Sequence, residues 1–131
     1  LDQPSALATR TALFTHVQDN ISNEQFDRNK ILITVHPEHH DIWYWLIPFS
    51  NGRSSIGVVA PQAFLEELTG DAEAKLRTLI SQADWLATVL CDAEYDTRIG
   101  MIEGYSCDVK QLYGDGFALL GNACEFLDPV F

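Results

Sequence analysis

Residues 41–48 read DIWYWLIP, and this stretch decides the fold expected for the 131-residue chain. In an extended strand, successive side chains point to opposite faces of the sheet. Trp43, Trp45 and Ile47 therefore share one face. The opposite face consists of Ile42, Tyr44 and Leu46. A strand that is apolar on both faces must be covered on both, by core on one side and by more core or a ligand on the other.

Three neighbouring stretches extend this strand into a sheet. Residues 11–17, 31–36 and 54–60 are rich in aliphatic and β-branched residues, as strands are, and the central strand is expected over 42–49. The Asn51-Gly52 pair predicts a type I′ hairpin, because such a turn needs positive φ at both positions. Residues 31–60 are therefore expected to form an antiparallel meander.

The apolar spacing then changes from that of a strand to that of a helix. A first helix is expected to begin at Pro61 and end at Gly70. Asp71 can cap a second helix, whose apolar stripe continues to Leu90 with a break expected near Gln82.

The remaining residues return to extended structure. Residues 97–105, 109–113 and 117–120 are expected as strands, and residues 1–10 as a linker. The order of strands, helices and strands predicts an α+β fold, with a mostly antiparallel sheet and helices packed on one face.

Charge and composition restrict the partners of this chain. Eight Lys and Arg against nineteen Asp and Glu give a formal charge of −11, which argues against nucleic-acid and membrane partners. No apolar run reaches the roughly 18 residues of a membrane span, and no secretory signal is visible, so a cytoplasmic location is expected. Cys91, Cys107 and Cys124 lack a C-x-x-C spacing and are expected to be reduced thiols.

The sequence offers little independent sign of catalytic chemistry. The densest group of metal-ligand types is His36, Glu38, His39, His40 and Asp41. Adjacent histidines in a turn diverge, so no metal site is expected there. His16 is expected to be a half-buried, hydrogen-bonded residue of the first strand. The chain has no G-x-S-x-G elbow and no glycine-rich phosphate loop.

Two motifs resemble those of flavin-dependent halogenases, which are relatives of the flavoprotein monooxygenases. Trp43-x-Trp45-x-Ile47-Pro48 resembles the WxWxIP motif of that family. Residues 114–131, GDGFALLGNACEFLDPVF, resemble the segment by which these enzymes return to their FAD domain. The motifs occur in the family's order, and the similarity extends over nearly the whole chain from residue 12.

The resemblance implies a domain division and a partition between flavin and substrate. Residues 1–114 would form a substrate-side α+β domain, and residues 115–131 would start the return to the FAD-binding domain. Trp43 and Trp45 would separate the flavin from the organic substrate and exclude water, so that the oxidant is spent on halide.

The resemblance also implies which residues contact FAD. Gly121 and Asn122 would take the place of a Gly-Asp pair near the ribityl and phosphate region. Asp128 and Pro129 would form the turn beside the isoalloxazine ring. Asn122 departs from the commoner Asp, and it supplies hydrogen bonds without negative charge.

The implied parent is an FAD-dependent oxidoreductase of the tryptophan-halogenase type. It would halogenate a small aromatic substrate with oxygen, halide and reduced flavin from a separate flavin reductase. The catalytic lysine is expected outside this chain, because no motif places Lys30, Lys75 or Lys110 in that role. The chain is expected to be part of a longer protein. On its own it is expected not to retain FAD, to be catalytically inactive, and to self-associate through uncovered apolar surface.

Two alternatives remain open. One is a non-halogenating flavin monooxygenase or other flavin oxidoreductase, which the absence of an upstream motif-placed lysine would favour. The other is a free-standing α+β domain whose indoles line a small-ligand pocket. Start and stop codons at the ends of this segment would favour the second. The identity of the aromatic and the choice between chloride and bromide are left open.

Overall fold

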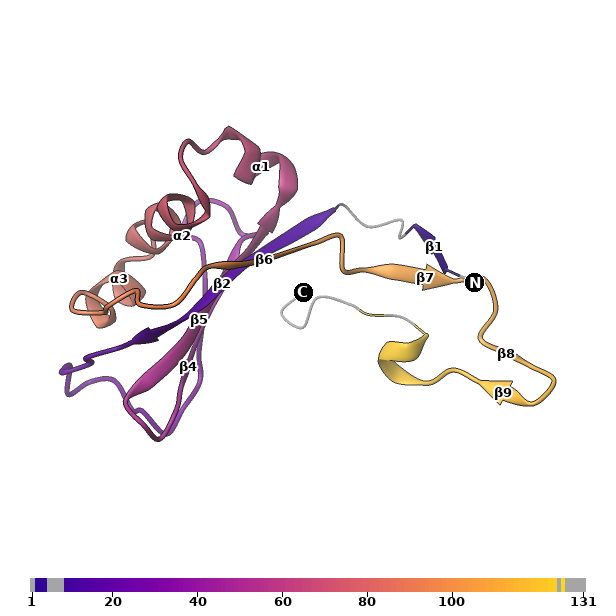
Figure 1. The fold of residues 1–131 in the computed structure, drawn as a ribbon, viewed down its shortest axis with the longest axis horizontal. Helices are drawn as coiled ribbons and strands as arrows, with labels where there is room; N and C mark the ends of the chain where they lie inside the picture. Colours follow the sequence, from indigo (N-terminus) through magenta and orange to yellow (C-terminus); the bar gives the residue numbers. More distant parts are fainter. Residues whose placement is uncertain (1, 5–8, 125, 127–131) are drawn as a thin grey trace.

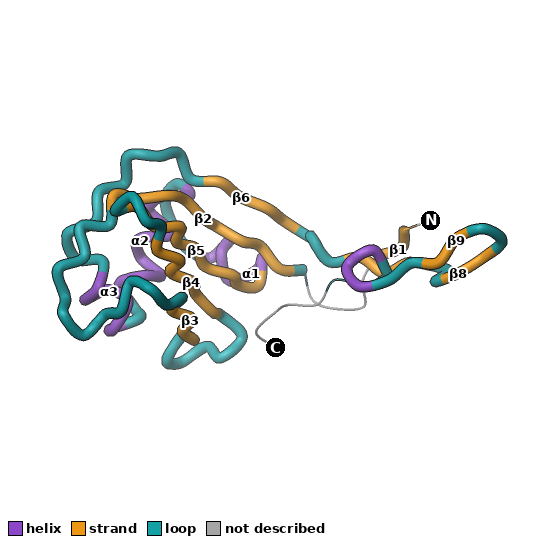
Figure 2. The backbone as a smooth tube through the Cα atoms, turned by 90° about the horizontal axis from the view of Figure 1, so that it is seen from below, coloured by secondary structure: helices purple, strands orange, loops and turns teal. Residues whose placement is uncertain are grey.

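A five-stranded antiparallel sheet organises the chain, of which the computed structural model describes residues 2–4, 9–124 and 126. The strand order is β3-β4-β5-β2-β6, and Figure 2 shows these strands side by side. The strands are β2 (Arg10–Gln18), β3 (Leu32–Val35), β4 (Trp43–Pro48), β5 (Arg53–Pro61) and β6 (Gly100–Glu103). The predicted meander is confirmed as β3–β4–β5.

Three short helices cover one face of this sheet (Figure 1). They are α1 (Gln62–Glu67), α2 (Ala72–Ser81) and α3 (Asp84–Val89). The carboxylate of Asp71 accepts a hydrogen bond from the backbone N of Ala74 at 2.9 Å, which confirms the predicted cap of α2. The break near Gln82 is also confirmed, because Gln82 ends α2. The α+β prediction, with helices on one face of a mostly antiparallel sheet, is therefore correct.

The predicted limits of the first helix are wrong. Pro61 is the last residue of β5 and precedes the first turn, and α1 already ends at Glu67. Leu68 adopts an extended conformation at the C-terminus of α1, so the helix stops before the glycine. Gly70, with a φ of +94°, instead turns the loop that leads to Asp71.

The main hydrophobic core lies between the helices and the sheet. Its fully buried members include Leu13, Val17, Ile42, Tyr44, Leu46, Ile56, Val58, Leu76, Leu79 and Leu86. Ile42, Tyr44 and Leu46 all face this side, as the alternation in residues 41–48 predicts. The Tyr44 hydroxyl donates to the carbonyl oxygen of Leu79 at 3.0 Å, and burial raises the pKa of Tyr44.

The turn between β4 and β5 differs from the prediction. The backbone N of Phe49 donates to the carbonyl oxygen of Arg53 at 2.8 Å, which leaves Ser50, Asn51 and Gly52 in the loop. Gly52 has a φ of +80°, whereas Asn51 is not in the positive region. The type I′ turn is therefore wrong, because a three-residue loop needs positive φ only at its last position.

The buried carboxylate of Asp19 anchors the β2–β3 connection to β5. It accepts hydrogen bonds from Arg28 Nη1 at 2.6 Å and from Ser54 Oγ at 2.5 Å, and its side chain is 2% exposed. Burial alone would raise the pKa of Asp19. The hydrogen bonds from Arg28, Ser54 and the backbone N of Ile21 outweigh burial and hold that pKa below its ordinary value.

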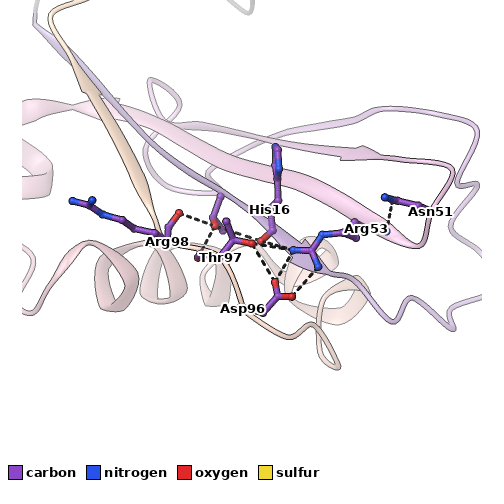
Figure 3. A network of polar contacts seen from close by, with 7 residues as sticks. His16, Asn51, Arg53, Asp96, Thr97 and Arg98 are labelled. Atoms are coloured by element: carbon purple, nitrogen blue, oxygen red, sulfur yellow. Dashed lines mark hydrogen bonds and ion pairs between the residues drawn. The ribbon is translucent and has the colours of Figure 1, made fainter.

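An exposed ion pair connects the β4–β5 hairpin to the segment before β6 (Figure 3). Arg53 donates to both carboxylate oxygens of Asp96, at 2.8 and 2.6 Å, and to Thr97 Oγ1 at 3.0 Å. Thr15 Oγ1 donates to the carbonyl oxygen of Thr97 at 2.9 Å. The guanidinium of Arg53 lowers the pKa of Asp96 to about 2.

Beyond β6 the chain forms small strand pairs that extend away from the helices (Figure 1). β1 (Asp2–Pro4) pairs with β7 (Cys107–Val109), β8 (Tyr113–Gly114) pairs with β9 (Phe117–Ala118), and a 3-10 turn, η1 (Gly121–Ala123), follows. The expected linker over residues 1–10 is thus partly strand. The predicted strands 109–113 and 117–120 are too long, because only Tyr113 with Ala118 and Gly114 with Phe117 pair in the β8–β9 hairpin.

Candidate functional site

The face of the sheet opposite the helices carries two rows of apolar residues across neighbouring strands. One row is Trp45, Gly57, Phe14 and Gly100, and the next is Trp43, Val59, Ala12 and Ile102. We call these two rows the open face. Trp43 is 6% exposed and Trp45 is half-buried, so the two indoles predicted to share a face do share it.

Large and small residues alternate along the first row. The ring centroids of Trp43 and Trp45 are 5.7 Å apart, and those of Phe14 and Trp45 are 6.4 Å apart. Gly57 leaves room for the Trp45 ring, and Gly100 leaves room for the Phe14 ring. Trp45 Nε1 donates to Ser55 Oγ at 3.1 Å, so the polar atom of this indole is satisfied within the sheet.

A cavity of about 370 Å³ opens on this face. Its lining residues are Ala12, Trp43, Trp45, Val59, Ile102, Tyr105 and Phe126. None of these side chains carries a charge, and the rings of Tyr105 and Phe126 meet edge to face with centroids 5.7 Å apart. The volume lies within the range of small-molecule sites, roughly 300–1,000 Å³. Aromatic walls of this kind suit a flat, uncharged ring.

Tyr105 and Phe126 are cavity residues that sequence reasoning missed. Phe126 lies outside the strands, and β6 ends at Glu103, so the predicted strand over 97–105 is too long and misplaces Tyr105. Phe126 belongs to the C-terminal motif over residues 114–131. The structure therefore brings that motif and the tryptophan motif together at this cavity.

The residues predicted to contact FAD are only partly described. Gly121 and Asn122 lie in η1 and are exposed, and neither lines the cavity. Asp128 and Pro129 lie outside the described residues. Gly121 has a φ of +56°, and a Cβ there would meet no atom within 4 Å, so the space beside it is open. An accessible amide next to this space fits the hydroxyl groups of a flavin side chain in its donors and acceptors.

The histidine-rich turn is held together by hydrogen bonds of its own. His36 is 4% exposed, its Nδ1 accepts from the backbone N of Glu38 and of His39 at 3.1 Å, and its Nε2 lies 3.0 Å from Gln82 Oε1. Both ring nitrogens are thus engaged. The described residues contain no group of three or more His, Cys, Asp or Glu arranged to hold a metal ion. His16 is exposed rather than half-buried, with its ring edge against Phe49.

The lysines of the described segments lie away from the cavity lining. Lys75 Nζ donates to the carbonyl oxygen of Leu65 at 2.7 Å on the helix side of the sheet. Lys30 forms an exposed ion pair with Asp27 at 3.4 Å.

Among residues 2–4, 9–124 and 126, none of the helices has the length and hydropathy of a membrane span.

Comparisons with known proteins find similar segments in flavoproteins, although no family model matches the sequence. The flavin-dependent halogenase gsfI of Penicillium aethiopicum is 31% identical over a 96-residue alignment that covers 68% of this chain and 18% of the halogenase. The crystal structure of a flavoprotein/dehydrogenase from Cytophaga hutchinsonii is 40% identical, with a TM-score of 0.81, over 99% of this chain and 31% of that one. The myxobacterial chondrochloren halogenase is 27% identical, with a TM-score of 0.73, over 93% of this chain and 28% of its own.

These similarities, together with the open face and its two indoles, define a segment of a flavin-dependent oxidoreductase fold. The chain is similar over 68% of its length to flavin-dependent halogenases, which supports its assignment to that family. It spans 18% of the length of the gsfI halogenase and 28% of the chondrochloren halogenase chain. The narrower tryptophan-halogenase assignment does not follow from these similarities.

Proposed function

We propose that this chain is the substrate-side part of an FAD-dependent halogenase-like enzyme that acts on a small aromatic molecule. The observation that carries this proposal is the uncharged cavity on the open face, which both tryptophans of the WxWxIP-like motif line. A cavity without charged groups binds an aromatic ring by burying its apolar surface and through contacts between aromatic rings. Residues 1–114 would form the substrate side, and residues 115–131 would begin the return to the FAD domain.

The chain's own residues would bind the ring, orient it and exclude water. Trp43 is almost fully buried and Trp45 is fixed to Ser55, so both present rigid walls to a ligand. A dry, rigid wall protects a reactive oxidant from water. FAD, when bound in the parent and reduced by a separate reductase, would supply the reducing equivalents that activate oxygen toward halide. Gly121 and Asn122 would contact it, with Asp128 and Pro129.

Activity of the full-length protein tests this proposal. The enzyme encoded by the gene that contains this segment should be given FAD, a flavin reductase with NADH, oxygen, bromide or chloride, and phenol. We expect a halogenated phenol by mass spectrometry, and we expect Trp43→Ala and Trp45→Ala to lower its yield at least about tenfold, as loss of binding-pocket contacts does.

Trp85→Ala is the matched control for these two variants. Trp85 lies in α3 on the helix side and is 38% exposed, outside the cavity lining. Its removal should leave the yield unchanged. Equal losses in all three variants would mean that the tryptophans act through stability alone, and the proposed role of the cavity would fail.

A second candidate is a flavin oxidoreductase without halide chemistry. The 40% identity to a protein described as a flavoprotein/dehydrogenase favours it, since that identity exceeds those to the related halogenases compared above. The same assay separates the two candidates: oxidised or hydroxylated phenol that is independent of halide would support the second. A motif-placed lysine in the coding sequence upstream of this segment would support the first.

A further inference from the structure

The indole of Trp45 is held by two residues of the neighbouring strand β5. Its Nε1 donates to Ser55 Oγ at 3.1 Å, and its six-membered ring lies over Gly57. Ser55 and Gly57 are alternate residues of β5, so both face the same side as the indole. The polar edge and the apolar edge of the ring therefore each have a fixed partner.

Gly57 is required by the ring above it and not by its backbone. A Cβ on Gly57 would overlap three carbon atoms of the Trp45 ring system. The φ of Gly57 is not in the positive region, so an alanine could adopt the backbone conformation without strain. The sheet lies beneath the indole, and a ring displaced from Gly57 must rise into the cavity that it lines.

We propose that Ser55 and Gly57 are positioning residues that seat the Trp45 indole and thereby set the largest aromatic that the cavity admits. This inference rests on the proposed function, because it takes the cavity to be the aromatic-binding site. Ser55 fixes the direction of the indole plane through its hydrogen bond. Gly57 fixes the height of the ring above the sheet, and with it the depth of the cavity.

The indole N–H resonance of Trp45 tests whether Ser55 positions this indole. In the ¹⁵N-labelled chain, assigned with Trp45→Phe, we expect Ser55→Ala to shift this resonance and to speed its exchange with solvent. Ser55→Thr retains the hydroxyl and should restore the wild-type position. Ser54→Ala is the matched control, because Ser54 points away from the indole and bonds to Asp19.

Ser54→Ala should lower stability and leave the Trp45 resonance in place. The proposal is overturned if Ser55→Ala leaves the resonance unchanged, or if Ser54→Ala moves it as far. A merely structural role for Ser55 would lower stability without changing the environment of this one N–H.

Binding of a one-ring and a two-ring probe tests the size limit. We expect Gly57→Ala to weaken binding of 1-naphthol at least about tenfold and binding of phenol less than about threefold, since small changes in pocket size discriminate by such factors. Gly100→Ala is the control: its Cβ would lie 2.7 Å from the ring of Phe14, which does not line the cavity. The 1-naphthol-to-phenol ratio should stay at its wild-type value in Gly100→Ala.

An unchanged ratio in Gly57→Ala, or the same change in Gly100→Ala, would overturn the inference. Failure of the proposed function gives a different result, in which the wild-type chain binds neither probe. In that case the Trp45 N–H resonance in the Ser55 variants still tests whether Ser55 positions the indole, because that experiment requires no ligand.

Discussion

At the residue scale, the alternation in residues 41–48 correctly divides the aromatic side chains between two environments. Trp43 and Trp45 lie on the open face, and Tyr44 lies in the helix-side core. The period of two in a strand is a property of the backbone, so one correct strand places every side chain in it. Phe126 could not be found in this way because it lies outside the strands, and Tyr105 was missed because β6 ends two residues before it.

The core hydroxyl of Tyr44 gives a first prediction. Tyr44→Phe should lower the free energy of unfolding by about 1 kcal/mol, the net value of one neutral hydrogen bond. The cost stays small because the carbonyl oxygen of Leu79 also accepts from the backbone N of Gln82 at 3.1 Å. Urea unfolding measures the difference. The Tyr95 hydroxyl has no hydrogen-bond partner among the described residues, so Tyr95→Phe should lower stability less. Equal losses in the two variants would refute a stabilising role for the Tyr44 hydrogen bond.

The buried carboxylate of Asp19 gives a larger effect. Asp19→Ala leaves Arg28, Ser54 and the backbone N of Ile21 without their shared acceptor. We expect a loss of about 2–4 kcal/mol, since breaking a buried charged network strands its remaining members. Asp27→Ala, in the same connection and 47% exposed, is the control and should cost far less. A loss below that of the control would show that the network contributes no stability.

At the element scale, the sequence predicts which elements exist better than it predicts where they end. The hydrogen bond from Ala74 to Asp71 and the stop at Gln82 follow from local chemistry that the sequence displays. The early end of α1 does not, because the extended conformation of Leu68 is set by packing against the core. The β4–β5 loop shows the same limit: Asn-Gly suits two loop lengths, and strand register selects between them.

The cap of α2 is tested by Asp71→Ala. We expect a loss of about 1 kcal/mol in the free energy of unfolding, which is typical for an N-cap aspartate. Asp84→Ala is the matched control in the first turn of α3, where no side chain caps the helix, and it should cost a few tenths of a kcal/mol at most. Chemical denaturation of both variants makes the comparison, and a reversed order would contradict the capping geometry.

At the scale of the whole molecule, one sheet separates a packed side from an open side. Helices α1 to α3 cover one face (Figure 1). The cavity and its two indoles lie on the other face. Three carboxylates of this acidic chain, Asp19, Asp27 and Asp96, have pKa values lowered by hydrogen-bond partners. Stability should therefore depend on pH in a range set by these pairs.

The Arg53–Asp96 pair predicts the direction of that dependence. The pKa of Asp96 falls from 3.8 to about 2 on folding, so the pair contributes stability above pH 3.8 and loses it as the pH falls toward 2. The difference in free energy of unfolding between the wild type and Asp96→Asn should therefore decrease as the pH is lowered from 6 to 2.5, as measured by urea titrations. Asp92→Asn, an exposed residue without an ion pair in the described ranges, should keep a constant gap. A difference that stays constant for Asp96→Asn would show that the Arg53–Asp96 pair contributes no pH-dependent stability.

Binding of an aromatic ring at Trp43 and Trp45 on the open face is tested by titrating the ¹⁵N-labelled chain with phenol. We expect saturable shifts of the Trp43 and Trp45 indole N–H resonances, with the Trp85 resonance unchanged on the helix side. Shifts confined to Trp85, shifts of all three indoles without saturation, or no shifts at all would contradict it.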